Sequence, residues 1–559
     1  MIEKDNNLEI IWERNYPGSM RRTIQIPQMS LYSLFKSSAE INSNKIAIIN
    51  NSKKMSYADT LREIDQFSAF LYEMGVRKGS SVGILLSNSI PFPIVFFAVL
   101  KLGATAVPMN ILLTEHELRV RIRETSSSTL IVMEEIVPRV LNILYTDLKK
   151  MIIVERDSYM TDNVLSNMVR KVSGLIETRN QNENIHYMSE AKFVIQTRNE
   201  EPVDPEKTTA AICFTSGLTS TPRGVILTHM NLVSNAHQMK EWSAPVQKDS
   251  LTMISGAPFF HAYGIVHGIL LPFLIGAKII ILGNHDDTLA AVTTISKESN
   301  VIFSSNPYMH KEMFEAINAR EPAIGCVSSL VSSNLAPSEI VENNSSGIKK
   351  TEILEGYGLT EAGSTISYMP IGYNILKEDS AGMPLPNTYV KIVDMKTGKL
   401  PVPLGETGEL IVTGPQIMAG FCNNPTDSAR VLKEGWLYTG DIASIDSDGF
   451  IYILGRKNDV FLSKGFVVSP SEIEKVILGN KNVEEAAVIG YKKNDIEFIK
   501  AFIVQKKGLR ITENEIIIQC NRFLADYKIP NSIEFVEFLP KNALGKIIKK
   551  SLMDMVMQQ

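Results

Sequence analysis

Hydrophobic residues in the early part of the chain follow two alternating periods. Residues Tyr57 to Met74 and Ile90 to Leu102 carry apolar side chains at helical spacing. Residues Ser81 to Leu86 and Thr105 to Met109 are short apolar runs of the kind found in buried strands. This alternation of helix and strand predicts α/β layers built on a largely parallel sheet.

The pattern changes further along the chain. A polar stretch from Asp157 to Lys207 is expected to form surface helix and linker, after which the alternation resumes from Ile212 to Leu330. From about Gly408 the chain turns to short β-branched runs separated by Gly, Asp and Asn, and the polar run Lys457 to Asp459 then interrupts the apolar pattern. The last hundred or so residues have strands and helices of their own, which is typical of a separate small domain.

We therefore predict an α/β protein with a large N-terminal domain and a small C-terminal one. The large domain, residues 1–455, has several subdomains with mostly parallel sheets and helices, and its β-rich subdomain covers about residues 375–455. A hinge at residues 456–459 leads to a mobile α+β domain at residues 460–559.

Composition narrows the functional classes. A chain of 559 residues, 44% of them hydrophobic, can bury a large core and is too long for one compact domain. Its 57 basic and 61 acidic residues give no electrostatic signal for a nucleic-acid partner. The four cysteines lack the spacing of a zinc site or a disulfide framework, which fits a reducing cytoplasm.

The sequence predicts neither secretion nor a membrane span. Residues Met1 to Asn7 are charged where a signal peptide is basic and then apolar. The apolar stretch Ser89 to Leu100 is too short to span a bilayer, and Gly264 to Leu282 contains His267 and Lys278. We expect both to be buried core elements of a cytoplasmic protein, with a peripheral membrane contact left open.

A dense cluster of hydroxyl groups, glycines and one cation follows the strand-like run Thr208 to Cys213. It reads Phe-Thr-Ser-Gly-Leu-Thr-Ser-Thr-Pro-Arg-Gly-Val over residues 214–225 and has no Walker pattern. Backbone N–H groups and hydroxyls can donate to phosphate oxygens while a guanidinium balances their charge. Taken alone, such a cluster is more often an ordinary surface loop. The candidate phosphate-binding residues are Thr215, Ser216, Gly217, Thr219 and Arg223.

Four further strings follow in order: Pro-Phe-Phe-His-Ala-Tyr-Gly at 258–264, Glu-Gly-Tyr-Gly-Leu-Thr-Glu at 355–361, Tyr-Thr-Gly-Asp at 438–441 with Gly-Arg-Lys-Asn-Asp at 455–459, and Pro-Lys-Asn-Ala-Leu-Gly-Lys-Ile at 540–547. In the second of these, Tyr357 can stack on adenine, Gly358 permits close backbone approach and Thr360 can bind a phosphate. Glu361 offers a hard oxygen to Mg²⁺, which commonly binds one carboxylate plus substrate phosphates. Singly, each string also fits a turn, a core histidine or a solvated lysine.

Together the five strings resemble the signature motifs of the adenylate-forming superfamily, which includes acyl-CoA synthetases, peptide adenylation domains and beetle luciferases. The resemblance extends from about Met29 to Leu552 and is greatest to long-chain fatty acid:CoA ligases over Glu355 to Glu361 and Pro401 to Asn423. It implies that the protein uses ATP and Mg²⁺, with coenzyme A as a co-substrate.

The resemblance also implies roles for single residues. Lys546 is the catalytic lysine of adenylation, acting with Thr360, Glu361 and His261, and His261 lies beside the acyl pocket and the thiol tunnel. Asp441 holds the ribose hydroxyls and Arg456 contacts ribose or phosphate. In this family the small domain rotates between the two half-reactions. The rotated state presents to the thiol tunnel a segment that includes Lys464, Gly465 and Phe466.

The chain departs from the usual motifs at several positions. Leu218, Ser220 and Arg223 stand where a hydroxyl residue, glycine and lysine are common, and Asn458 stands where the hinge usually has Asp or Lys. Arginine keeps the charge of lysine but not its geometry. The segment 332–337 also differs from the glycine-rich loop that is usual at this place. The contacts at the adenine edge and the shape of the acyl pocket therefore do not follow from the resemblance.

Three functions remain open at this point. The preferred one is an acid–thiol ligase that converts a medium- or long-chain fatty acid to acyl-AMP and then to acyl-CoA. A second keeps adenylation but loads an acyl carrier protein. A third is a non-catalytic homologue that binds nucleotide or acyl chain, motivated by the altered phosphate loop; retention of Glu361, Asp441, Arg456 and Lys546 argues against it.

Overall fold

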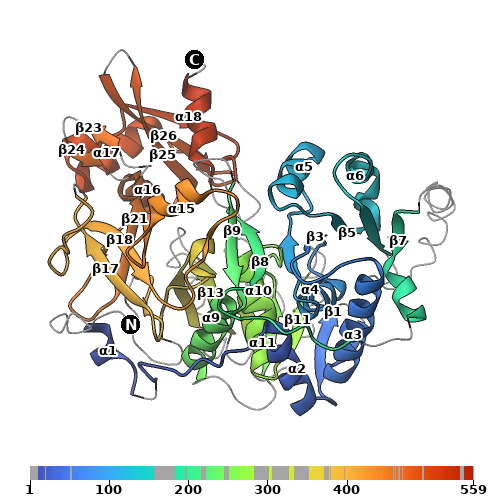
Figure 1. Ribbon diagram of the computed structural model, residues 1–559. Coiled ribbons are helices and arrows are strands. Elements are labelled where there is room, and N and C mark those ends of the chain that lie inside the picture. Colours follow the sequence, from blue (N-terminus) through green and yellow to red (C-terminus); the bar gives the residue numbers. More distant parts are fainter. Residues whose placement is uncertain are drawn as a thin grey trace.

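The computed structural model shows an α/β protein in which two large sheets with their helices lie beside a β-rich part and a small C-terminal part (Figure 1). It describes residues 11–18, 20–50, 53–155, 183–194, 198–215, 222–244, 251–282, 301–304, 327–332, 352–370, 377, 379–395, 397–457, 459, 461–463, 466–468, 470–493, 496–541 and 547–557.

One large sheet has eight strands within this described part, and its centre is parallel, as the helix–strand alternation predicted. The two strands that flank the candidate phosphate loop, β8 and β9, pair antiparallel. In spatial order the strands are β19 (Gly420–Phe421), β9 (Gly224–Thr228), β8 (Thr209–Phe214), β4 (Thr105–Pro108), β3 (Ser81–Leu85), β5 (Thr129–Met133), β6 (Lys150–Val154) and β7 (Ile185–Tyr187).

The other large sheet has nine described strands, parallel in the middle and antiparallel at both ends. Strand β14 leads directly into the Gly-Tyr-Gly string. The order is β16 (Met383–Pro384), β15 (Ser367–Tyr368), β14 (Glu352–Tyr357), β13 (Val327–Ser332), β12 (Val301–Ser304), β10 (Thr252–Ser255), β11 (Lys278–Ile281), β1 (Ile46–Asn50) and β2 (Lys53–Ser56).

Helices cover these sheets and begin at capping residues that the sequence supplies. Ser30, Ser56, Thr114 and Thr228 each accept a hydrogen bond from a first-turn backbone N–H group. The helices are α2 (Leu31–Ile41), α3 (Tyr57–Glu73), α4 (Pro91–Lys101), α5 (Glu115–Glu124), α6 (Val137–Leu144), α9 (His229–Trp242), α10 (Ala262–Ile265) and α11 (Leu271–Leu274), with 3₁₀ turns η1 (Glu134–Ile136) and η3 (Met188–Phe193).

The β-rich part and the C-terminal part have their own sheets. The first contains β17 (Tyr389–Val393), β18 (Gly408–Thr413), β20 (Leu432–Lys433), β21 (Trp436–Ile445) and β22 (Ile451–Arg456), with α15 (Pro425–Val431). The second contains β23 (Phe461–Ser463), β24 (Phe466–Val468), β25 (Val483–Lys493), β26 (Ile496–Gln505) and β27 (Ser532–Phe535), with α16 (Pro470–Leu478), α17 (Glu513–Phe523), η7 (Asp526–Lys528) and α18 (Lys549–Met557). The C-terminal elements lie above the β-rich ones in Figure 1.

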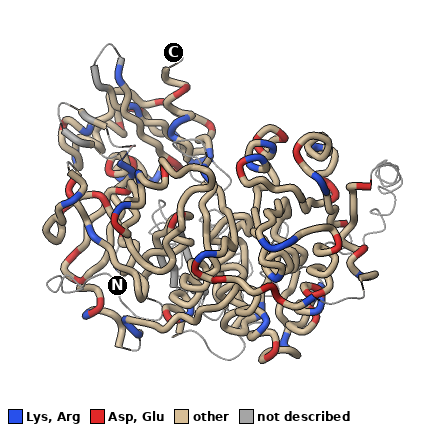
Figure 2. The backbone as a smooth tube through the Cα atoms, viewed as in Figure 1, with Lys and Arg blue, Asp and Glu red and all other residues tan. Residues whose placement is uncertain are grey.

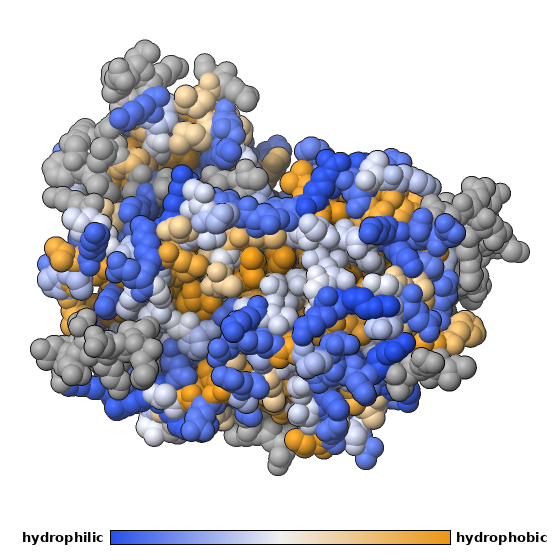
Figure 3. Space-filling view, in the orientation of Figure 1, coloured by the Kyte–Doolittle hydropathy of each residue, from blue (hydrophilic) through white to orange (hydrophobic). Residues whose placement is uncertain are grey.

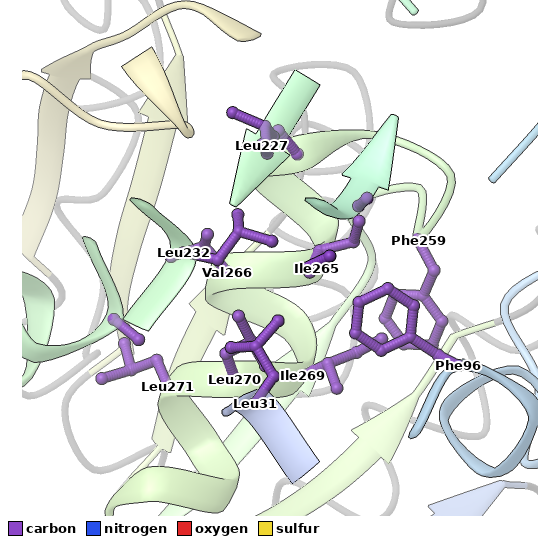
Figure 4. Packing of buried hydrophobic residues seen from close by; sticks show 14 of the residues in the cluster. Leu31, Phe96, Leu227, Leu232, Phe259, Ile265, Val266, Ile269, Leu270 and Leu271 are labelled. Atoms are coloured by element: carbon purple, nitrogen blue, oxygen red, sulfur yellow. The ribbon is translucent and has the colours of Figure 1, made fainter. Parts of the chain in front are cut away.

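The apolar stretch from Gly264 is core, as predicted. A single π-helical turn, η5 (Val266–Leu270), joins α10 to α11. Figure 4 shows its apolar side chains packed against residues of other elements, among them Leu31, Phe96, Leu227 and Phe259. In the part of the chain that the structure describes, no helix has both the length and the hydrophobicity needed to cross a bilayer.

Charged residues of both signs are interleaved over most of the described chain (Figure 2). On the face shown in Figure 3, hydrophilic residues predominate at the periphery and apolar residues are grouped nearer the middle.

The N-terminal segment has a role that its sequence pattern did not predict. In helix α1 (Ile11–Asn15), Trp12 packs so closely on Gly449 that a Cβ added there would lie 2.6 Å from the Trp12 Cα. The Tyr16 hydroxyl donates to the carbonyl of Pro384, and Arg21 forms an ion pair with Glu241 of α9 at 2.7 Å. The segment therefore connects the β-rich part to the helices of the large sheets.

Three histidines with lowered pKa values predict how stability depends on pH. Burial lowers the pKa of His229 to about 4 and that of His267 to about 3, and burial together with the charge of Lys240 lowers the pKa of His237 to about 4. The unfolded chain therefore binds more protons than the folded one below pH 6.5. Each histidine removes about 1.4 kcal/mol of unfolding free energy per pH unit as the pH falls from 6.5 toward its folded-state value. Urea unfolding at pH 7, 6 and 5 measures this slope.

His229→Gln tests the contribution of one histidine, and we expect it to reduce the slope by about a third of the three-histidine effect. His116→Gln, at an exposed position, is the matched control. An unaltered slope in His229→Gln would contradict the assignment.

Candidate active site

The candidate phosphate loop is closed at its base by two hydrogen bonds. The backbone N–H of Thr215 donates to the Arg223 carbonyl at 3.0 Å, and the N–H of Arg223 donates to the Thr215 hydroxyl at 3.1 Å. Since Thr215 directly follows β8 and Arg223 directly precedes β9, the antiparallel pair fixes both ends of the loop. The predicted residues Ser216, Gly217 and Thr219, with the departures Leu218 and Ser220, lie outside the described residues.

The guanidinium group of Arg223 has the surroundings of an anion-binding group. It lies 4.2 Å from the ring centre of Phe421, and its Nη1 is 3.8 Å from a carboxylate oxygen of Asp427. Its Nε is buried and has no hydrogen-bond partner among the described residues. A buried N–H without an acceptor is costly, so the site fits an added anionic oxygen. Stacking on Phe421 also gives a reason for arginine here, since the flat guanidinium stacks on rings better than an ammonium does.

The Gly-Tyr-Gly string forms a tight turn after β14. The N–H of Ile366 donates to the Tyr357 carbonyl at 2.9 Å, and residues Thr360–Ala362 form the 3₁₀ turn η6. A Cβ on Gly358 would lie 1.7 Å from the Ser364 carbonyl oxygen. The predicted glycine is thus required by the chain's own backbone, whatever approaches it from outside.

Asp441 joins two of the predicted motifs. Its buried carboxylate accepts a hydrogen bond from the Tyr357 hydroxyl on one oxygen and from Arg456 Nε, at 2.8 Å, on the other. Asp441 and Arg456 are register partners on β21 and β22. Burial and the negative charge of Asp441 together raise the pKa of Tyr357 well above its usual value, so the phenol stays protonated and donates. An ionised carboxylate is an acceptor with two oxygens, which is the chemistry that ribose hydroxyls require.

Charged residues of two other motifs influence the ionisation of Glu361. Burial raises the pKa of its carboxyl, the positive charges of Arg456 and Arg223 lower it, and Asp441 adds to the rise. Arg223 of the phosphate loop and the Asp441–Arg456 pair of β21 and β22 are therefore close enough to Glu361 to influence its ionisation. A cation bound there would stabilise the ionised carboxylate.

The residues present fit Mg²⁺ bound together with a polyphosphate. Among the described residues there is no group of three or more His, Cys, Asp or Glu side chains that could hold a metal ion by themselves. Mg²⁺ commonly keeps several waters and takes one or two carboxylates plus substrate phosphates. Glu361 would supply the carboxylate, and the ion would neutralise phosphate charge.

The segment before His261 is held by a residue that the sequence did not indicate. Asn88 accepts a hydrogen bond from the N–H of Phe259 and donates to the carbonyl of Ala257, both at 2.8 Å. His261 then begins helix α10, with its N–H bonded to the Pro258 carbonyl at 3.1 Å. Asn88 is 171 positions from Phe259 and belongs to no motif, so only the structure identifies it.

Another unpredicted residue anchors the chain just before the expected hinge. The buried Glu409 of β18 accepts from Lys457 Nζ at 2.8 Å and from the Gly440 N–H at 3.3 Å. The expected hinge residue Asn458 and the expected site residues Lys464, Gly465 and Lys546 lie outside the described part, and of Phe466 only the backbone, in β24, is described. Their roles stay predictions.

Comparison with known proteins agrees with this geometry. The family model "AMP-binding enzyme" matches residues 35–422, and "AMP-binding enzyme C-terminal domain" matches residues 472–546. A long-chain-fatty-acid–CoA ligase of Bacillus subtilis (strain 168) is 30% identical, with 97% of each chain covered. The chain therefore belongs to the AMP-binding enzyme family.

Solved structures share the fold. An anthranilate CoA ligase in complex with anthranoyl-AMP superposes with a TM-score of 0.81 at 24% identity, covering 96% of this chain and 98% of that one. The O-succinylbenzoate coenzyme A synthetase of Bacillus subtilis, in complex with ATP and magnesium ion, gives 0.76 at 23% identity, covering 94% and 100%. The predicted α/β architecture is confirmed.

The predicted enzyme class is confirmed as well. The chain is an AMP-forming acid–thiol ligase, an acyl-CoA synthetase whose reaction uses ATP, Mg²⁺ and coenzyme A. Its substrate is a small-molecule carboxylic acid.

The turn after β14 gives a prediction about Gly358. Gly358→Ala places a methyl group against the Ser364 carbonyl, so we expect a loss of at least about 2 kcal/mol in unfolding free energy and weaker nucleotide binding. Urea unfolding and fluorescence titration with a labelled ATP measure the two effects. The control is Gly18→Ala, where no atom lies within 4 Å of the added Cβ and no change is expected. Wild-type behaviour of Gly358→Ala would contradict the close contact.

Proposed function

We propose that this enzyme activates a medium- or long-chain fatty acid. A carboxylate oxygen of the acid attacks the α-phosphorus of ATP, the bond to pyrophosphate breaks, and acyl-AMP forms. The sulfur of coenzyme A then attacks the acyl carbon, AMP leaves, and the thiol proton passes to solvent. The observation that carries the adenylation step is the buried Asp441 carboxylate, which joins Tyr357 of the turn after β14 to Arg456. The charges of Arg223 and Arg456 also influence Glu361. The fatty acid is supported by the names of relatives that match nearly the whole chain.

Different residues bind different parts of the nucleotide in this proposal. Arg223, with Thr215 and Thr360, binds phosphate oxygens, because its buried Nε requires an acceptor. Asp441 binds the ribose hydroxyls through its carboxylate while Tyr357 and Arg456 hold it in place. Lys546 neutralises the reacting oxygens, and His261 borders the acyl pocket.

The small domain, residues 460–559, rotates between the two half-reactions in this proposal. In the observed arrangement Ser471 of α16 donates to the Leu454 carbonyl, and Lys475 pairs with Asp379. The side chains of Lys475 and Asp379 are 64% and 48% exposed, so breaking the ion pair costs little. The proposed hinge is residues 456–459, and because Glu409 holds Lys457, the rotation within it is centred on Asn458 in this proposal. The rotation then brings Lys464, Gly465 and Phe466 to the thiol tunnel.

A cytoplasmic location belongs to the same proposal. Cys213, Cys422 and Cys520 are free thiols in the described structure, as expected in a reducing compartment. Loading of an acyl carrier protein and a peripheral membrane contact are kept as outcomes for experiment.

ATP/pyrophosphate exchange with acids of two to eighteen carbons and with benzoate tests the substrate. We expect the highest kcat/KM for unbranched acids of about eight to sixteen carbons, since each buried methylene adds roughly 0.8 kcal/mol of binding. Thioester formation is then compared between free coenzyme A and a phosphopantetheinylated carrier protein, and we expect coenzyme A to be preferred. A preference for benzoate or acetate would refute the fatty acid assignment, and no exchange with any acid would favour a non-catalytic binding protein.

Lys546→Ala separates the two half-reactions. We expect pyrophosphate exchange to fall by more than about 100-fold, because the charge that offsets two approaching anions is lost. Thioester formation from a supplied acyl-adenylate should stay within about threefold. Lys541→Ala is the control, since Lys541 is paired with Glu485 at 2.6 Å and should affect neither step. Equal loss of both steps in Lys546→Ala would contradict the division of labour.

A further inference from the structure

His267 is a fully buried histidine to which the proposed mechanism gives no role. It lies in the π-helical turn η5, whose other side chains are apolar and pack into the core shown in Figure 4. π-helical turns are rare and occur frequently at functional sites. A buried imidazole in such a turn therefore calls for a specific contact.

That contact is a hydrogen bond to Thr365. His267 Nε2 lies 2.7 Å from the Thr365 hydroxyl oxygen, and Nδ1 is buried with no partner among the residues described. An orphaned N–H costs more than an orphaned acceptor, so the proton belongs on Nε2 and the histidine donates to Thr365. Burial lowers the pKa of His267 to about 3, which keeps this neutral form throughout the physiological range.

Thr365 in turn is held to the nucleotide turn. Its backbone N–H and carbonyl are both bonded to the Asn235 side chain, at 3.0 and 2.9 Å. The preceding residue, Ser364, presents its carbonyl oxygen at the point where a Cβ on Gly358 would clash. A displacement of Thr365 is therefore transmitted to the backbone between Tyr357 and Glu361.

The other face of His267 contacts the helix that begins at His261. The imidazole lies 4.5 Å from the ring centre of Tyr263, with the two planes 36° apart. The hydroxyl of Ser304, on β12, donates to the Tyr263 hydroxyl at 3.3 Å. His267 thus touches the expected acyl side through Tyr263 and the nucleotide side through Thr365.

We propose that His267 is a positioning residue that connects the His261–Tyr263 segment to the Thr360–Glu361 turn and thereby sets the affinity for magnesium nucleotide. The proposal rests on the proposed function only in taking this turn to hold nucleotide. His267 acts through its hydrogen bond to Thr365.

The experiment measures binding of α,β-methylene-ATP with Mg²⁺ to the full-length protein by isothermal titration calorimetry. His267→Asn is too short to reach Thr365, whereas His267→Gln places an amide nitrogen near the position of Nε2. We expect His267→Asn and Thr365→Val each to raise the Kd about tenfold, the double variant to be no weaker than either one, and His267→Gln to stay within about threefold of wild type.

Ser255→Ala is the matched control for a purely structural effect. Ser255 donates to the Gly268 carbonyl in the same π-helical turn at 2.9 Å and does not reach Thr365. We expect Ser255→Ala to lower the melting temperature about as much as His267→Asn while leaving the Kd unchanged. Equal Kd values for wild type and His267→Asn, additive effects in the double variant, or an equal loss of affinity in Ser255→Ala would each overturn the proposal.

The measurement requires neither acid nor coenzyme A, so it separates the two claims. If the Kd values follow the expected pattern while no fatty acid supports exchange, the fatty acid assignment fails and the role of His267 stands. If fatty acids are activated while the Kd values are unchanged, the role of His267 fails and the proposed function stands.

Discussion

The buried carboxylate of Asp441 is the charge around which the site is arranged. A carboxylate that is 4% exposed is stable only if its oxygens are paired. Its partners come from two different sheets, because Tyr357 ends a strand of the nine-stranded sheet and Arg456 ends β22 of the β-rich part. Pairing this one charge therefore fixes the β-rich part against the sheet that carries the nucleotide turn.

The contacts around the site differ in strength in a way that suits a two-step enzyme. Inside the large domain, Asn231 and Asn235 of α9 bond to backbone groups of distant segments, and both are buried. Between the large domain and the C-terminal part, the ion pair of Lys475 with Asp379 is exposed and weak. This ion pair can be broken at little cost, as the proposed rotation of the small domain requires.

The departures from the usual motifs are compatible with this chemistry where the structure describes them. Arg223 in place of lysine is accompanied by Phe421, whose ring supports the guanidinium, and by Asp427, which orients it. These two residues lie between β18 and β20 in sequence, about two hundred positions from the loop. An arginine in the phosphate loop and an aromatic residue at position 421 therefore act as one unit.

The sequence by itself determined the local elements and the chemical class. The helix α3 and the strand β3 begin and end within about one residue of the positions that apolar spacing predicted, because this signal acts between near neighbours. The sequence strings also proposed Arg223, Glu361, Asp441 and Arg456 as site residues, and these roles stay predictions. Only the tertiary structure decided that Tyr357 pairs with Asp441, that Asn88 holds the chain before His261, and that His267 meets Thr365. These contacts join residues 84, 171 and 98 positions apart, and their energy depends on burial created by the whole fold, which no local pattern encodes.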